Sequence, residues 1–255
     1  DLCLTSDEHL VAIHNLTINA CSDVEEVTGS SDDYFVSEHT LEELLQFNFG
    51  AKFLNKNGNR PYQNLVSVDQ EDRATVIRDN KLNVVTIDEI FERYAKTDLM
   101  FIVEIKDSGE KGKKAADILN SLISDGFKDD NLLKRVVIGT FHNDVEKYLK
   151  NTYPNIMRGG SVGEVTKFVM TQMFGVNIFD SSSFACLQIP VSEAAFGITI
   201  KLNRKTYVKR AHRRNISVQY WTINEKEEMR NLIELGADVI MTDNPDVLSE
   251  LLIEM

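Results

Sequence analysis

The 255-residue chain carries 28 Lys and Arg residues against 40 Asp and Glu residues, and its formal net charge of −12 predicts repulsion from nucleic acid and from anionic lipid headgroups. The hydrophobic fraction of 42% suffices for a globular core and excludes wholesale disorder. No apolar run approaches the roughly 18 residues that cross a bilayer, and three scattered cysteines form no disulfide framework, so we expect no membrane insertion and favour a cytoplasmic location.

Strand and helix signals alternate from about residue 82 to the end of the chain, after two short extended segments at its start. Residues 186–200 are ambiguous and fit two short extended pieces. Segments 1–4 and 10–13 together would supply one strand, folded back near residues 6–8. The six other predicted strands are 100–105, 135–140, 155–158, 176–179, 217–221 and 239–242. The predicted helices are 41–47, 87–94, 115–123, 144–150, 164–173, 205–213, 227–235 and one opened by Pro245.

This alternation predicts an α/β fold in which the strands run parallel, either as a (β/α) barrel or as a doubly wound sheet. Residues from about 20 to 80 interrupt the alternation, because they are polar and contain a stretch rich in Gly and Asn. We interpret them as an insertion on a barrel loop. Polar residues end several apolar strands, among them Glu104, Lys106 and Trp221, and the carboxyl ends of parallel strands are where an α/β barrel places its chemistry.

Six short motifs occur in order along nearly the whole chain. They are DLCLTSD (1–7), LVAIHN (10–15), EIK (104–106), TF (140–141), WTIN (221–224) and TDNP (242–245). Each motif alone is weak, but together they resemble the glycerophosphodiester phosphodiesterase family. The resemblance implies a (β/α)8 TIM-type barrel made of residues 1–255 as a single domain, with the insertion after its second strand.

The chain also departs from the family pattern. The family opens with a His-Arg-Gly strand, a helix, and the Glu of a Glu-x-Asp motif, none of which occurs in residues 1–255. The barrel expected here therefore lacks its first strand and helix. A barrel strand buries several apolar side chains that contribute roughly 1.5–3 kcal/mol each, so we expect these residues to belong to a longer polypeptide. Asn15 stands where the family has Asp, and Ala20 where it has Arg.

The resemblance implies roles for five residues. Asp1 and Glu104 would hold a divalent cation, and oxygen ligands suit Mg²⁺ or Ca²⁺. His14 would act as a general acid or base, paired in the family with a second histidine. Lys106 would bind phosphate, and Trp221 would form an apolar wall for the substrate. Without the resemblance, each residue has a structural alternative, such as an ion pair between Glu104 and Lys106.

The reaction implied is metal-dependent hydrolysis of a glycerophosphodiester, a small-molecule substrate, to glycerol 3-phosphate and an alcohol. Two alternatives remain open at this stage. The first is a lysophospholipase D-like activity, for which Phe184, Leu187, Ile189 and Phe196 could form an apolar mouth. The second is an inactive barrel that serves as a binding module. The sequence does not fix the oligomeric state.

Overall fold

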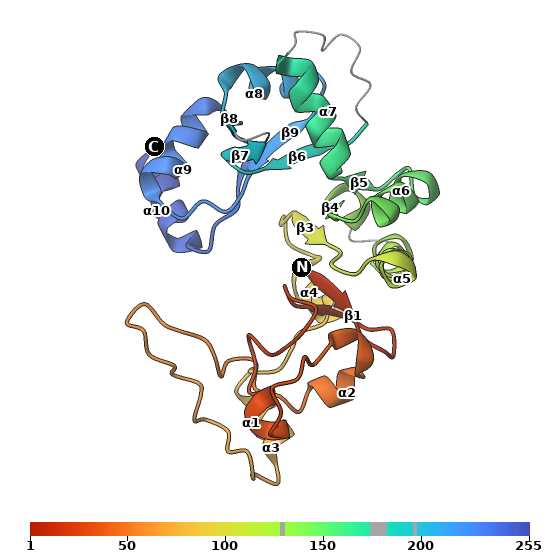
Figure 1. Cartoon of the computed structure of the whole chain (residues 1–255), viewed down its shortest axis with the longest axis vertical. Helices are drawn as coiled ribbons and strands as arrows, with labels where there is room; N and C mark the ends of the chain where they lie inside the picture. The colour runs from red at the N-terminus through yellow and green to blue at the C-terminus, as the bar shows by residue number, and fades with distance from the viewer. Residues whose placement is uncertain (128–130, 174–182, 196–197) are drawn as a thin grey trace. The chain divides into compact units, whose positions relative to one another are not determined.

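The computed structural model describes residues 1–127, 131–173, 183–195 and 198–255. The chain divides into two compact units, residues 1–156 and residues 157–255 (Figure 1). Each unit contains parallel strands with connecting helices and has a buried apolar cluster of its own. The α/β class predicted from the alternation is therefore confirmed.

Four short strands position the candidate site residues of the first unit. Strand β1 (Leu2–Leu4) turns back into β2 (Leu10–Ala12), with which it pairs antiparallel, as predicted for the first two extended segments. Strand β3 (Phe101–Glu104) pairs in parallel with β4 (Val136–Gly139). A parallel bridge between Leu2 and Ile105 places β1 beside the end of β3.

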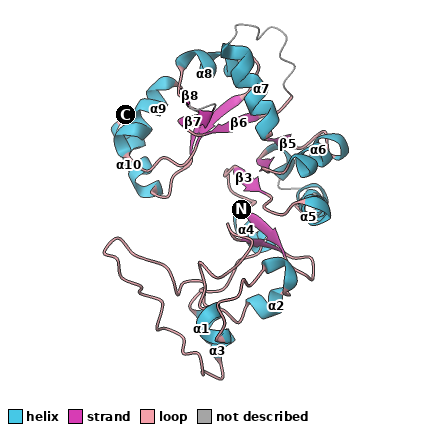
Figure 2. Ribbon diagram, in the orientation of Figure 1, coloured by secondary structure: helices cyan, strands magenta, loops and turns pink. Residues whose placement is uncertain are grey.

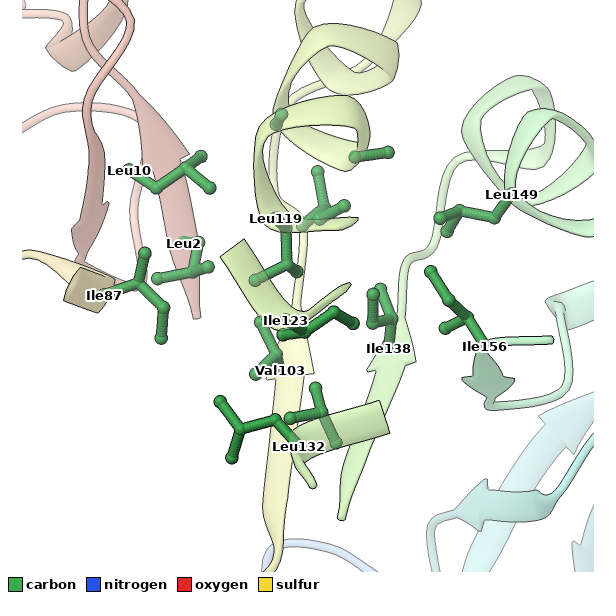
Figure 3. Close-up of a cluster of buried hydrophobic side chains, with 14 of the residues drawn as sticks. Leu2, Leu10, Ile87, Val103, Leu119, Ile123, Leu132, Ile138, Leu149 and Ile156 are labelled. Carbon is green, nitrogen blue, oxygen red and sulfur yellow. The ribbon is translucent and has the colours of Figure 1, made fainter. Parts of the chain in front are cut away.

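Three helices cover these strands and complete the core. Helix α4 (Ile87–Tyr94) begins at a capping box in which Thr86 and Glu89 exchange hydrogen bonds, as the sequence predicts. Helices α5 (Gly109–Ser121) and α6 (Asn143–Thr152) follow β3 and β4. Figure 3 shows side chains from neighbouring strands and from α5 meeting in one cluster, which includes Leu2, Val103, Leu119 and Ile138.

The segment between β2 and α4 is mostly loop (Figure 2), and its interpretation as an insertion on a barrel loop stays a prediction. It contains α1 (Val24–Thr28), a 3₁₀ turn (Val36–Glu38), α2 (Leu41–Leu44) and α3 (Arg73–Asp79). All of residues 45–72 are described, and none of them lies in a helix or strand. The sequence predicted α2 too long and did not predict α1 or α3, because helices of five and seven residues show too few turns to display a period.

The second unit contains a parallel sheet in the order β10–β9–β6. Its helices are α7 (Val162–Met173), α8 (Lys205–His212), α9 (Lys226–Leu235) and α10 (Pro245–Glu254). Gly236 ends α9 at φ 102°, a left-handed conformation that favours glycine. The strands are β5 (Met157–Arg158), β6 (Cys186–Ile189), β7 (Ser192–Ala195), β8 (Ile198–Lys201), β9 (Ser217–Tyr220) and β10 (Val239–Ile240).

One predicted strand and one ambiguous segment need comment. The strand predicted at 176–179 lies outside the described residues. The segment 186–200 holds β6 and the antiparallel pair β7–β8, so two extended pieces were too few. Within the described part of the chain, no helix has the length and apolar character needed to cross a bilayer.

Candidate active site at the ends of the first unit's strands

Asp1 and Glu104 occupy neighbouring positions on adjacent strands. The backbone N–H of Lys106 donates to the carbonyl of Leu2 at 3.0 Å, and Leu2 bridges Ile105 in parallel. This register sets Asp1 beside Glu104. The register therefore brings the two carboxylate-bearing residues to neighbouring positions, and their role as cation ligands stays a prediction.

Lys106 lies between the two carboxylates. Its Nζ is 2.9 Å from Oε1 of Glu104 and 3.2 Å from Oδ1 of Asp1. The Lys106 side chain is 14% exposed, whereas those of Asp1 and Glu104 are 35% and 24% exposed. The ion pair that the sequence offered as the structural alternative is thus present. It leaves one net negative charge on carboxylates that solvent and ligands can reach.

His14 comes from the strand on the other side of β1. The N–H of Ile13 donates to the carbonyl of Asp1 at 3.1 Å, so His14 follows directly beyond a residue paired with Asp1. Its side chain is exposed, and its Nδ1 lies 2.9 Å from Oδ1 of Asn15. A neutral His14 that donates this hydrogen bond from Nδ1 presents Nε2 as a base.

Trp221 belongs to the second unit. It follows β9 directly, and its backbone N–H donates to the carbonyl of Ile189 at the end of β6, at 3.3 Å. The half-buried Trp221 therefore stands at the carboxyl ends of two parallel strands. Three of the five predicted site residues, Asp1, Glu104 and Lys106, thus meet in the first unit. His14 lies on the segment that pairs with Asp1, and Trp221 occupies a strand end in the second unit.

The structure adds His142, which the six sequence motifs do not include. His142 follows β4, and its Nε2 lies 3.0 Å from the carbonyl oxygen of Lys106. Because a carbonyl only accepts, Nε2 carries the proton and Nδ1 is the free acceptor. The backbone N–H of His142 donates to Oγ1 of Thr140 at 3.2 Å. The available signal was its position one residue after the TF motif.

Asp107 is a second addition. It directly follows the EIK motif, and its Oδ2 accepts a 2.7 Å hydrogen bond from the backbone N–H of Leu4. The residue is only 4% exposed. Burial raises the pKa of the Asp107 carboxyl above its usual value, with the Leu4 hydrogen bond as a smaller opposing cause. Asp107 therefore holds β1 against the segment after β3.

The donor set of Asp1 and Glu104 fits a hard divalent cation. Their oxygens are the ligand type that Mg²⁺ and Ca²⁺ prefer, and both are near enough to reach one Lys106 nitrogen. Among the residues that the structure describes, no group of three or more His, Cys, Asp or Glu side chains is placed to hold a metal. Two carboxylates alone suit Mg²⁺, which commonly takes one or two carboxylates together with waters and substrate phosphate.

The apolar mouth considered for a lysolipid substrate is wrong for three of its four residues. Phe184, Leu187 and Ile189 are 4%, 1% and 3% exposed and belong to the second unit's core. Leu187 and Ile189 lie two residues apart on β6 and so share one face of the strand, and that face packs with Phe184 in the second unit's core. Phe196 lies outside the described residues.

Comparison with known proteins is consistent with this site. Residues 1–247 match the model of the glycerophosphoryl diester phosphodiesterase family. A glycerophosphodiester phosphodiesterase of Caldanaerobacter subterraneus is 23% identical over 98% of this chain and 83% of its own length. The solved glycerophosphoryl diester phosphodiesterase domain of a Mycobacterium tuberculosis protein has a TM-score of 0.70, with 11% identity over 100% of this chain and 86% of that chain.

An Oleispira antarctica phosphodiesterase, solved in complex with the product sn-glycerol-3-phosphate, has a TM-score of 0.66. It is 16% identical and aligns with 99% of this chain and 83% of its own. These solved relatives share the family's TIM-barrel fold. The family match across the chain, together with the carboxylates, lysine and histidine at one strand edge, shows that the chain belongs to the glycerophosphoryl diester phosphodiesterase family of phosphodiester hydrolases.

Proposed function

We propose that this chain hydrolyses glycerophosphodiesters to glycerol 3-phosphate and an alcohol with the help of a divalent cation, and that residues 1–255 work as a single barrel domain. The observation that carries the proposal is the meeting of Asp1, Glu104 and Lys106 at one strand edge, with His14 on the adjoining strand. Phosphodiester hydrolysis needs stabilisation of charge on phosphoryl oxygens and transfer of protons, and these side chains can supply both.

Asp1 and Glu104 would hold the cation. When bound, a divalent cation polarises a phosphoryl oxygen and orients the substrate. Lys106, which pairs with both carboxylates, would bind the phosphate once those carboxylates hold the cation. His14 moves a proton at Nε2, with Nδ1 held by Asn15. Trp221 gives the substrate an apolar wall.

Glycerophosphodiesters are favoured over lysolipids as substrates. Three of the four residues that motivated the lysolipid alternative, Phe184, Leu187 and Ile189, are packed in the core. The resident groups of the first unit's site are instead charged or polar. A water-soluble diester such as glycerophosphocholine is therefore the substrate on which to test the site.

Replacing Glu104 by Gln tests the assignment. The amide keeps the size of the side chain but removes the negative charge that binds the cation, so we expect the turnover of glycerophosphocholine to fall at least ~100-fold in the full-length protein. Isothermal calorimetry with Mg²⁺ or Ca²⁺ should show weaker binding in the same variant.

The control is Glu110→Gln, which removes an exposed carboxylate that pairs with Lys113 at 2.7 Å on α5. This variant should keep both activity and cation affinity. Wild-type turnover in a correctly folded E104Q protein would contradict the proposed role of Glu104. Lost turnover with unchanged cation binding would contradict the cation role alone.

A further inference from the structure

The chain's positive charge is concentrated in one segment. Seven of its 28 Lys and Arg residues lie between positions 201 and 214, and no Asp or Glu occurs from 194 to 224. The net charge of −12 therefore hides a strongly basic stretch, which includes β8, α8 and the turn after it. Repulsion from anionic surfaces, inferred from net charge alone, need not hold at this stretch, because exposed charges act mainly within a Debye length of about 8–10 Å.

The packing of α8 fixes which way this charge faces. Tyr207, Val208 and Ala211 are 5%, 2% and 0% exposed and pack in the second unit's core. The opposite side of the helix and its flanks carry five exposed basic residues, here called the basic face: Lys201, Arg204, Lys205, Lys209 and Arg213. Because the apolar side is occupied by the core, the basic face is held toward solvent.

None of the basic face residues has an acidic partner within the described part of the chain. The neighbouring His212 pairs with Asp238 at 2.8 Å, but the five basic side chains form no ion pair. The Arg204 guanidinium lies over the ring of Tyr207, with its Cζ 5.7 Å from the ring centroid. Lys205, Lys209 and Arg213 follow one another at four-residue spacing, so like charges are neighbours along the helix, an arrangement that destabilises an isolated helix.

Helix electrostatics explains only part of this pattern. Cations in the last turn of a helix interact favourably with its dipole, which accounts for Lys209. Arg204 and Lys205 instead stand at the start of α8, where cations are disfavoured and where the first turn contains no acidic residue. A partner of opposite charge would remove this disadvantage.

We propose that the basic face binds the surface of an anionic phospholipid bilayer. Binding would be peripheral and electrostatic, since the face contains no exposed apolar residue to insert. Nucleic acid is disfavoured because its binding sites commonly add aromatic platforms for bases, whereas Tyr207 is buried here. The inference does not depend on the catalytic roles proposed above.

One end of the basic face is joined to the carboxyl end of strand β9 in the second unit. Leu202 lies between Lys201 and Arg204, and its carbonyl accepts a 3.2 Å hydrogen bond from the hydroxyl of Tyr220. Tyr220 ends β9 and immediately precedes Trp221. The Lys201 and Arg204 end of the basic face is therefore the end linked to the strand end that carries Trp221. Glycerophosphodiesters are the headgroup portion of phospholipids.

Vesicle sedimentation with the full-length protein tests this inference. We expect binding to vesicles of phosphatidylcholine mixed with phosphatidylglycerol, weakening with added salt, and little binding to pure phosphatidylcholine. A Lys or Arg near such a surface contributes roughly fivefold in affinity, so the double variant Lys205→Glu/Lys209→Glu should bind at least ~25-fold more weakly. Turnover of a soluble diester should stay at the wild-type level.

The matched control is Lys96→Glu/Lys167→Glu, which changes the net charge equally at two exposed lysines that do not belong to the basic face. Equal losses in the two double variants would overturn the inference, since they would show a net charge effect. Absence of binding to the anionic vesicles would overturn it as well. So would salt-dependent binding of single-stranded RNA, lost in the basic face variant, without vesicle binding.

Discussion

The ion pairs of Lys106 contribute little to stability. Its partners Asp1 and Glu104 are 35% and 24% exposed, and ion pairs this accessible stabilise a protein by about 0–1 kcal/mol. Three side chains held together for so little stabilisation are available for ligands. The same spacing that identified Glu104 and Lys106 in sequence places them on one side of the strand end.

Asp107 provides a pH test at the level of one residue. Burial raises its pKa above the ordinary 3.8, so the folded state favours the protonated form. The stability gained from that preference is present below 3.8 and is lost as pH rises through the raised pKa. Asp107→Asn stays neutral at every pH and can still accept from Leu4, so it should be at least as stable as wild type at neutral pH.

Urea unfolding at acidic and neutral pH checks this prediction. The difference in free energy of unfolding between Asp107→Asn and wild type should shift in favour of the variant as pH increases. Asp98→Asn, at an exposed loop position, should show no such trend. A variant that loses stability relative to wild type with increasing pH would show that the ionised carboxylate is favoured in the folded protein.

At the level of elements, local sequence signals predicted the bounds of a helix well where the helix was long or had a capping residue. The Thr86 capping box gave the start of α4, and Gly236 gave the end of α9. The elements missed or misjudged are short ones, such as α1, α3 and the β7–β8 pair. Tertiary contacts determine whether such short segments form a helix or a strand. A segment of so few residues is too short to display the hydrophobic repeat of either element.

A buried ion pair holds together the segment between β2 and α4, which has no regular hydrophobic repeat. Arg73, at the start of α3, pairs with Asp23 at the start of α1, and both side chains are 8% exposed. Arg73 also donates to the carbonyls of Gln46 at 2.9 Å and Ser67 at 3.0 Å. The second oxygen of Asp23 accepts from the backbone N–H of Asn48 at 2.9 Å. Four segments of the loop therefore meet at two side chains.

Arg73→Met should destabilise the protein by about 3–5 kcal/mol, because Asp23 would remain buried without its cation. The double variant Asp23→Asn/Arg73→Met should recover part of this loss, since it removes the uncompensated charge. Chemical denaturation followed by circular dichroism measures both effects. Arg78→Met, on the exposed side of the same helix, serves as the control and should change stability by less than ~0.5 kcal/mol.

For the whole molecule, the ordered motifs predicted the family and most of the residues of the first unit's candidate site. They did not predict the contacts of Asp107 and His142 or the basic face. Asp107 and His142 carry no strong motif of their own, and their contacts arise only when β1, β3 and β4 come together. The basic face was hidden by net charge, which sums over the chain and ignores where charges lie. The contacts of Asp107 and His142 and the exposure of the basic face depend on residues that are neighbours in space but distant in sequence.

The proposed single domain predicts that unfolding is cooperative across the two units. Leu119 is fully buried in the first unit, and Leu119→Ala should cost about 2–5 kcal/mol. The chain's one tryptophan, Trp221, reports on the second unit by fluorescence. If residues 1–255 unfold as one domain, Leu119→Ala lowers the denaturation midpoint of Trp221 fluorescence as much as that of the circular dichroism signal.

Leu232→Ala supplies the reciprocal measurement, because Leu232 is 2% exposed in the second unit's core. It should shift both signals together in the same way. An unchanged Trp221 midpoint in Leu119→Ala, with an early loss of helical signal, would mean that each unit unfolds by itself. In that case a core substitution in one unit would leave the strand ends of the other intact, and the site assigned to the first unit would have to be tested without reliance on Trp221.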